Sequence, residues 1–243
     1  MMERMKNPVF NPFIRARDWK GAAGYLSDGN KDIRRNAARA LAEIGDPDAA
    51  GALIAAISDP DAWVRLDIVR ALGKLRAPDA LDTLAAMLHD QNMDIRMEVL
   101  HALGCIRDLR VAQPLLQALK DPHQEIRSGA AAALDMIGWR PSRDQERVLL
   151  LMAKKRWVDL LQINEIPIES VWESLREREE YVRLDAIEAL GATGDARVAD
   201  FLLLGFTDPS RAVRISALQE SARFPSFDPD SFAKGIRKAL HPS

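Results

Sequence analysis

A thiol and an imidazole stand four residues apart in this sequence, at Cys105 and His101. On a helix they would share one face, as the thiolate–imidazole pair of a nucleophilic enzyme requires. No neighbouring residue is placed to orient the imidazole, and the sequence has neither a nucleophile-elbow serine nor a glycine-rich phosphate loop. Cys105 is the only cysteine, which excludes an intramolecular disulfide and a cysteine-rich metal site. We therefore assign no catalytic, cofactor-binding or metal-binding residue and expect a protein that is not an enzyme.

Six arginines at matched positions form the most regular set of charged residues. Each follows an aliphatic residue, and an acidic residue precedes each by six positions. A guanidinium can bind a carboxylate and turn carbonyls together, so we expect a structural ladder, with ligand binding as the alternative. Because each arginine has its own acidic partner, the column does not read as a nucleic-acid stripe. The predicted ladder comprises Arg34, Arg65, Arg96, Arg127, Arg183 and Arg214, with Asp59, Asp90, Asp121 and Asp208.

A second set of positions is predicted to form one stripe along the same helices. The stripe takes the residues two before and two, five and nine after each arginine, which share a helix face because they are separated by four, three and four residues. It holds eight acidic and four basic residues, which favours a locally basic partner. Trp63 and Tyr181 occupy equivalent positions and are either binding anchors or side chains that pack over a neighbouring helix end. The predicted partner-binding residues are Trp63, Asp67, Arg70, Asp94, Glu98, His101, Glu125, Tyr181 and Asp185.

These columns arise from an internal repeat. An aliphatic residue and arginine, followed by Ala-Leu six and seven residues after the arginine, recur at residues 33–41, 64–72, 95–103, 126–134 and 182–190, and a sixth copy at 213–214 lacks the Ala-Leu pair. Successive arginines are 31 residues apart, except for a gap of 56 between Arg127 and Arg183. Each unit holds two segments whose apolar residues step by three and four, and none alternates as a strand would. Such helix–turn–helix units bury their apolar stripes only by stacking, which predicts an α-solenoid.

The string Val64-Arg65…Ala71-Leu72-Gly73 resembles the HEAT-repeat family, in particular its short-unit subclass named after phycobilisome lyases. The resemblance covers about residues 28–223. It implies an all-α solenoid of stacked HEAT-like repeats, about 31 residues per unit, whose second helices line a concave groove. It also implies a binding scaffold. Deoxyhypusine hydroxylases are built of similar repeats and hold iron with recurring His-Glu pairs, but no histidine here is followed by glutamate, which argues against a di-iron oxygenase.

We expect residues 1–243 to form a single solenoid whose ends and middle depart from the repeat. Residues 1–28 are predicted as an N-terminal cap, 29–138 and 163–224 as repeats, and 225–243 as a C-terminal capping helix, with a dimer contact as the alternative role of the ends. Residues 139–162 contain two short amphipathic segments. They form either an eroded repeat that continues the stack or a specialised insertion that bends it or meets a partner.

The composition is that of a soluble globular protein, with 47% hydrophobic and 29% charged residues. A net charge of −2 argues against nucleic acid as the partner, and the longest apolar run, residues 49–57, is too short for a membrane span. A single cysteine suits a reducing, cytoplasmic location. We predict a non-enzymatic scaffold that holds a protein or peptide in its concave groove without a cofactor. The alternatives are a lyase-type subunit acting on a chromophore-carrier protein and a nucleic-acid-binding solenoid.

Overall fold

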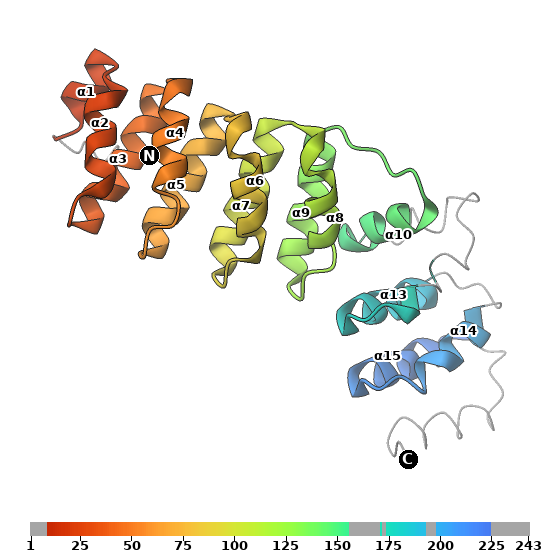
Figure 1. Ribbon diagram of the computed structural model, residues 1–243. Coiled ribbons are helices and arrows are strands. Elements are labelled where there is room, and N and C mark those ends of the chain that lie inside the picture. The colour runs from red at the N-terminus through yellow and green to blue at the C-terminus, as the bar shows by residue number, and fades with distance from the viewer. Residues whose placement is uncertain (1–8, 156–170, 172–173, 193–197, 225–243) are drawn as a thin grey trace, which may run out of the picture. The chain divides into compact units, whose positions relative to one another are not determined.

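The computed structural model describes residues 9–155, 171, 174–192 and 198–224, and every regular element among them is a helix (Figure 1). The chain is an all-α solenoid, which confirms the predicted fold class. It divides into two compact units, which are described separately: Met1–Ala118 with Ser128–Arg140, and Leu119–Arg127 with Pro141–Ser243. Two predictions lie outside the described residues: the second amphipathic segment within residues 139–162 and the C-terminal capping helix of residues 225–243.

The first unit is built from pairs of helices. Three long helices, α3 (Lys31–Ile44), α5 (Ala62–Leu75) and α7 (Met93–Ile106), lie side by side in chain order, and a shorter helix precedes each of them (Figure 1). The remaining α-helices of this part of the chain are α1 (Asn11–Ala16), α2 (Trp19–Ala23), α4 (Ala50–Ala55), α6 (Leu81–Ala86), α8 (Ala112–Ala118) and α9 (Gln124–Met136), whose residues 124–127 are assigned to the second unit. The long helices therefore form a layer whose exposed face is continuous over three repeats.

Side-chain caps fix where each long helix begins. Asn30, Asp61 and Asn92 accept hydrogen bonds from backbone N–H groups in the first turns of α3, α5 and α7. Each helix then runs for 14 residues and stops at a residue in the left-handed conformation. Because the three helices have the same length and the same start, equivalent repeat positions lie next to one another across the layer.

A glycine allows neighbouring long helices to approach closely. A Cβ atom on Gly73 would lie 2.8 Å from the Cα atom of Ala102 in α7, so the contact between α5 and α7 requires a residue without a side chain. Ile68, Leu72 and Leu103 nearby are fully buried. The glycine of the Ala-Leu-Gly string is therefore a packing residue.

The ladder arginines join successive repeats. Arg34 donates to the carbonyl of Asp28 at 2.8 Å, and its Nε and Nη2 atoms donate to the two carboxylate oxygens of Asp59 at 2.6 and 2.9 Å. The equivalent carboxylate pairs are Arg65–Asp90 and Arg183–Asp208. Arg96, Arg127 and Arg214 likewise donate to the carbonyl six residues before them. The sequence interpretation gave each arginine the acid that precedes it. In the pairs Arg34–Asp59, Arg65–Asp90 and Arg183–Asp208, however, the carboxylate comes from the following repeat.

The second unit contains α10 (Asp144–Ala153), α13 (Glu180–Ala192), α14 (Val198–Gly205) and α15 (Arg211–Ser221), with residues 119–127. Here the ladder departs from its register, because the position 25 residues after Arg127 is Met152, which is apolar and buried. Arg127 instead donates to Asp185 of α13 at 2.8 Å, and both side chains are buried. The 56-residue gap is thus bridged by a more distant acid.

Three aromatic rings form a cluster at the start of the described chain. Phe10 is fully buried, its ring centroid lies 5.3 Å from that of Tyr25, and the centroid of Phe13 lies 5.8 Å from Tyr25. Helices α1 and α2 both contact α3. This cluster occupies the segment for which the sequence predicts an N-terminal cap.

Candidate functional site

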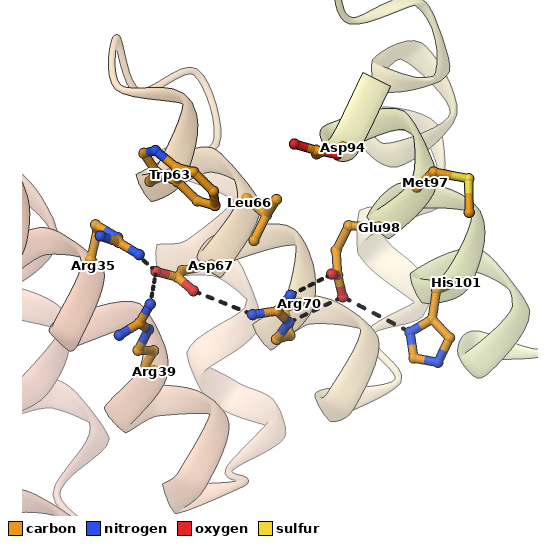
Figure 2. Close-up of a pocket in the computed structure, with 10 residues that line it drawn as sticks. All are labelled: Arg35, Arg39, Trp63, Leu66, Asp67, Arg70, Asp94, Met97, Glu98 and His101. Carbon is orange, nitrogen blue, oxygen red and sulfur yellow. Dashed lines mark hydrogen bonds and ion pairs between the residues drawn. The ribbon is translucent and has the colours of Figure 1, made fainter. Parts of the chain in front are cut away.

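The candidate site is a groove over the three long helices of the first unit, with a volume of about 590 Å³ (Figure 2). We call it the α3–α5–α7 groove. It is lined by Arg35, Arg39, Trp63, Leu66, Asp67, Arg70, Asp94, Met97, Glu98 and His101. Six of the nine residues predicted to bind a partner are among them: Trp63, Asp67, Arg70, Asp94, Glu98 and His101.

Four positions of the repeat build this groove. Counted from the ladder arginine of each helix, the lining residues stand at −2, +1, +2 and +5. The stripe predicted from the sequence contains −2, +2 and +5 but lacks +1, which supplies Arg35, Leu66 and Met97. Helical spacing alone could have found them, because +1 lies three residues after −2 and four before +5. Arg39, a stripe residue outside the predicted partner-binding set, also lines the groove.

A buried carboxylate, Asp67, forms the floor of the groove. Arg35 Nε and Arg39 Nη2 each lie 3.0 Å from its Oδ2 atom, and Arg70 Nη1 lies 3.6 Å from Oδ1 (Figure 2). Asp67 is only 1% exposed, and a buried charge is tolerated when opposite charges and hydrogen bonds compensate it. The carboxylate therefore holds three arginines in place, and the contact of Asp67 with a partner stays a prediction.

Arg70 bridges two of the long helices. Its Nη2 and Nε atoms donate to the Oε2 and Oε1 atoms of Glu98 in α7 at 2.7 and 3.3 Å. The hydrogen bonds from Arg70 to Glu98 raise the pKa of the guanidinium. The Arg70 side chain stays about half exposed, whereas that of Glu98 is mostly covered. The guanidinium therefore faces solvent above its carboxylate partner.

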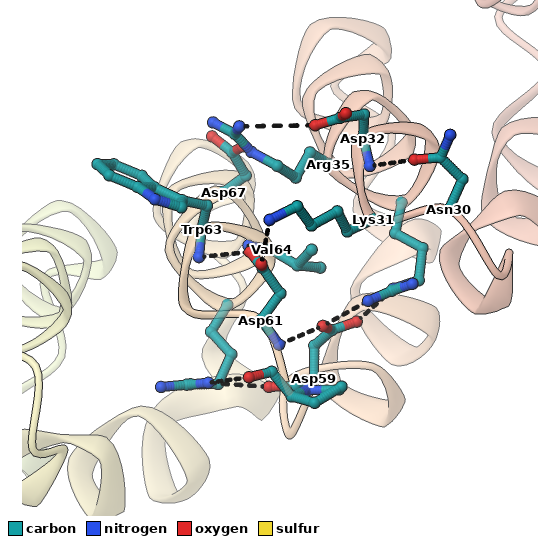
Figure 3. Close-up of polar contacts among 12 residues, drawn as sticks. Asn30, Lys31, Asp32, Arg35, Asp59, Asp61, Trp63, Val64 and Asp67 are labelled. Carbon is teal, nitrogen blue, oxygen red and sulfur yellow. Dashed lines mark hydrogen bonds and ion pairs between the residues drawn. The ribbon is translucent and has the colours of Figure 1, made fainter.

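Trp63 stands at the rim of the groove and is 54% exposed. The guanidinium carbon of Arg35 lies 5.5 Å from the ring centroid, a cation–π contact that holds the ring. The backbone N–H of Trp63 donates to Asp61 Oδ1 at 2.9 Å, which fixes the residue at the start of α5 (Figure 3). Trp63 is thus an exposed aromatic side chain in a supported position.

The predicted site residues of the second unit are placed differently. The hydroxyl of Tyr181 donates to the carbonyl of Lys120, and the guanidinium of Arg127 lies 5.2 Å from the ring centroid. Burial raises the pKa of Tyr181. Burial also raises the pKa of Asp185, against the opposing effect of Arg127. Tyr181 therefore packs within the unit and Asp185 pairs with a ladder arginine, whereas Glu125 is exposed. Partner binding by these three residues stays a prediction.

The thiol–imidazole pair forms a contact. Cys105 Sγ lies 3.7 Å from His101 Nε2, and Glu98 Oε1 lies 3.9 Å from His101 Nδ1. The sequence showed no residue that could orient the imidazole, yet Glu98 faces it. Glu98 is, however, held by Arg70, and the imidazole is largely exposed to water. This arrangement lacks the fixed, desolvated geometry of nucleophilic catalysis, and we assign it no catalytic role.

Within the described residues, no group of three or more His, Cys, Asp or Glu side chains is arranged to hold a metal ion. No helix in the described ranges combines the length and apolar character needed to cross a bilayer.

Comparison with sequence families matches HEAT repeats at residues 22–104, 63–135 and 87–157, which together span more than half of the chain. The chain belongs to the HEAT-repeat family. A further unit of this HEAT-repeat protein, residues 182–208, matches the PBS lyase HEAT-like repeat. The family resemblance stated from the sequence is confirmed.

Several solved repeat structures are similar to this HEAT-repeat protein at low identity. The complex of CpcE and CpcF of phycocyanin lyase from Nostoc sp. PCC7120 is 20% identical with a TM-score of 0.46, over 91% of this chain and 93% of that chain. Human deoxyhypusine hydroxylase in complex with glycerol is 20% identical with a TM-score of 0.44, over 96% and 98%. A designed armadillo repeat protein is 16% identical with a TM-score of 0.41, over 85% and 99%. No curated protein matches the chain.

Proposed function

We propose that this HEAT-repeat protein is a non-enzymatic interaction scaffold that binds an extended segment of a partner protein in the α3–α5–α7 groove. The observation that carries the proposal is Trp63, a large aromatic side chain that is exposed at the rim while Arg35 supports its ring. Tryptophan and arginine are the residue types that most often dominate binding energy at protein interfaces. The single thiol, which is partly exposed, suits a reducing compartment, and we propose a cytoplasmic location.

The dimensions of the groove support an extended ligand. Its lining comes from three consecutive long helices, and packed helices lie about 8–10 Å apart. The lining therefore spans on the order of 20 Å across the helix axes. An extended chain advances about 3.3 Å per residue, so about six residues of a partner would lie along it. This length suits a peptide segment better than a compact small molecule.

A partner would meet less negative charge on the groove surface than the number of acidic residues in the stripe suggests. The sequence predicts a locally basic partner because the stripe holds more acidic than basic side chains. Two of those acids, Asp67 and Asp185, are buried and paired with arginines. The count therefore overstates the negative charge on the accessible surface, and the proposal does not rest on a basic partner.

A matched pair of variants tests the groove. Trp63→Ala removes the rim aromatic, and Leu109→Ala removes a similarly exposed apolar side chain that does not line the groove. Each full-length protein is immobilised, incubated with native lysate, and its captured proteins are quantified by mass spectrometry. We expect partners held by the parent to be lost with Trp63→Ala and kept with Leu109→Ala, with an affinity loss of about 2 kcal/mol or more for an isolated partner. Equal capture by the parent and Trp63→Ala would contradict binding in the groove.

A further inference from the structure

We propose that the α3–α5–α7 groove selects a partner segment in which two acidic side chains stand three residues apart in an extended conformation. This inference rests on the proposed scaffold function and specifies the chemistry of its partner. It starts from position +5 of the repeat, where Arg39, Arg70 and His101 occupy equivalent places on three adjacent helices. Figure 2 shows these three side chains in a row along one side of the groove.

In this row, positive charge faces solvent and negative charge lies beneath it. Arg39 is 44% exposed, and its one ion-pair partner within the described chain is Asp67 on the groove floor. Arg70 is 46% exposed, and its partner Glu98 is mostly covered. An arginine has five N–H donors, and these carboxylates use only some of them. Arg35 is shared between the covered Asp67 and the exposed Asp32, at 3.0 and 4.0 Å. At position +5, however, the carboxylate partners of Arg39 and Arg70 are covered, so the exposed charge there is that of the two guanidinium groups.

The opposite side of the groove carries different chemistry. Position −2 places Trp63 between Asp32 of α3 and Asp94 of α7, and both carboxylates are exposed. A nucleic-acid strand carries a phosphate at every nucleotide, and these two acids would repel such a continuous polyanion. Separate carboxylates over the arginine row avoid that repulsion. Trp63 offers a contact for an apolar side chain beside them.

The distance between helices sets the spacing of the acidic residues. Arg39 and Arg70 lie on neighbouring helices, whose axes are about 8–10 Å apart. A polyproline II segment rises about 3.1 Å per residue with three residues per turn, so residues i and i+3 point the same way about 9 Å apart. Same-side residues of a β-strand are closer, at about 6.7 Å. Carboxylates at i and i+3 therefore match the two guanidinium groups, which would bind them through charge-assisted hydrogen bonds.

Labelled peptides that are identical except at the tested positions probe this spacing on the full-length protein by fluorescence anisotropy. One peptide of about ten residues carries two glutamates at i and i+3, a second carries them adjacent, and a third replaces both with lysine. An oligothymidine of similar length is the fourth probe. At about 50 mM salt we expect the i, i+3 peptide to bind about three- to tenfold more tightly than the adjacent pair, and the lysine peptide not to bind. The preference should weaken at about 500 mM salt.

A matched arginine pair assigns the effect to the groove. Arg39→Gln should abolish the preference for the i, i+3 peptide. Arg110→Gln should keep it, because Arg110 is an exposed arginine paired with one aspartate but does not line the groove. Circular dichroism verifies that both variants are folded.

Four results would overturn the inference. They are equal binding of the two glutamate peptides, tighter binding of the lysine peptide, an Arg39-dependent preference for oligothymidine, and no binding of the i, i+3 peptide at about 1 mM. If one of these occurs while Trp63→Ala still loses its captured partner, the scaffold function stands and only the acidic specificity is wrong. If Trp63→Ala also has no effect, the proposed function fails with it.

Discussion

The carboxylate on the groove floor allows a sharp test of how this surface is held together. Asp67→Asn keeps the shape of the side chain and removes the charge that compensates Arg35, Arg39 and Arg70. The amide also brings two N–H donors to a place where the structure requires acceptors. We expect the three guanidinium groups to repel one another and the long helices that carry them to be less stable.

The structure sets the expected size of this effect. Removing one partner of a buried ion pair costs about 3–5 kcal/mol. The Asp67 side chain is completely covered, but its partners are partly exposed, so water screens part of the repulsion and the cost falls to about 2–3 kcal/mol. In a chain of this length, 1 kcal/mol corresponds to about 2–4 °C in Tm. Asp67→Asn should therefore lower Tm by about 4–12 °C.

The same Asp→Asn substitution on the neighbouring helix α3 provides the control. Asp32 lies on α3 at 4.0 Å from Arg35 and is 69% exposed. Asp32→Asn should change Tm by no more than about 2 °C, because exposed ion pairs contribute little. Thermal unfolding of the parent and both variants is followed by circular dichroism in one buffer. Equal Tm values for the two variants would refute the conclusion that the charge of Asp67 organises the groove.

Three further substitutions test other parts of the structure. Gly73→Ala should destabilise the first unit, because the added Cβ would lie 2.8 Å from the backbone of α7. The control Gly51→Ala has open space around its added Cβ and should stabilise the protein by about 0.5–1 kcal/mol. Equal denaturation midpoints for the two variants would show that the close approach at Gly73 is not needed. Tyr181→Phe should cost about 1 kcal/mol in urea unfolding, because it loses the hydrogen bond to the Lys120 carbonyl. It should leave partner capture unchanged, and loss of capture would instead support Tyr181 as a binding anchor. Burial alone would raise the pKa of Asp59, but the hydrogen bonds it accepts, above all from its ladder arginine, lower it. A lowered folded-state pKa stabilises the protein above the unfolded value of about 3.9, and this stability is lost as pH falls through the folded value. Asp59→Asn should therefore be less stable than the parent at pH 7, with a difference that shrinks as the pH falls below the unfolded value of about 3.9 and through the lower folded value. A difference independent of pH would exclude the charge as its cause.

The repeat made the register of the helices predictable from sequence. The Ala-Leu columns mark buried positions, and every other residue of a helix follows from its distance to the ladder arginine. Counting in this way placed six groove residues correctly on one surface. Whether such a residue is exposed was not predictable, because it depends on side chains from the neighbouring helix. Arg35 covers Asp67 from 32 residues away, and a single-helix pattern contains no trace of that contact.

Two other differences between the sequence predictions and the structure also arise from long side chains. The acid six residues before each ladder arginine lies in the turn that precedes the arginine's helix, yet the guanidinium of Arg34 extends to Asp59 in the following repeat. Trp63 and Tyr181 occupy the same repeat position, but only Tyr181 carries a hydroxyl, and that hydroxyl donates to the Lys120 carbonyl. Equivalent positions therefore acquire different surroundings where the 31-residue spacing is interrupted.

The regular ladder has a consequence for the copy number of the repeat. Among the described residues, Arg34 and Arg65 bind within their own turn and the turn of the next repeat. A chain with one more 31-residue copy between α5 and α7 would keep this pattern in register and add one member to each row of the groove. The readable length of a partner would then grow by about 9 Å, or three residues of a polyproline II segment. After Arg127 the same duplication would separate its guanidinium from Asp185, so elongation is compatible with the first unit and not with that junction.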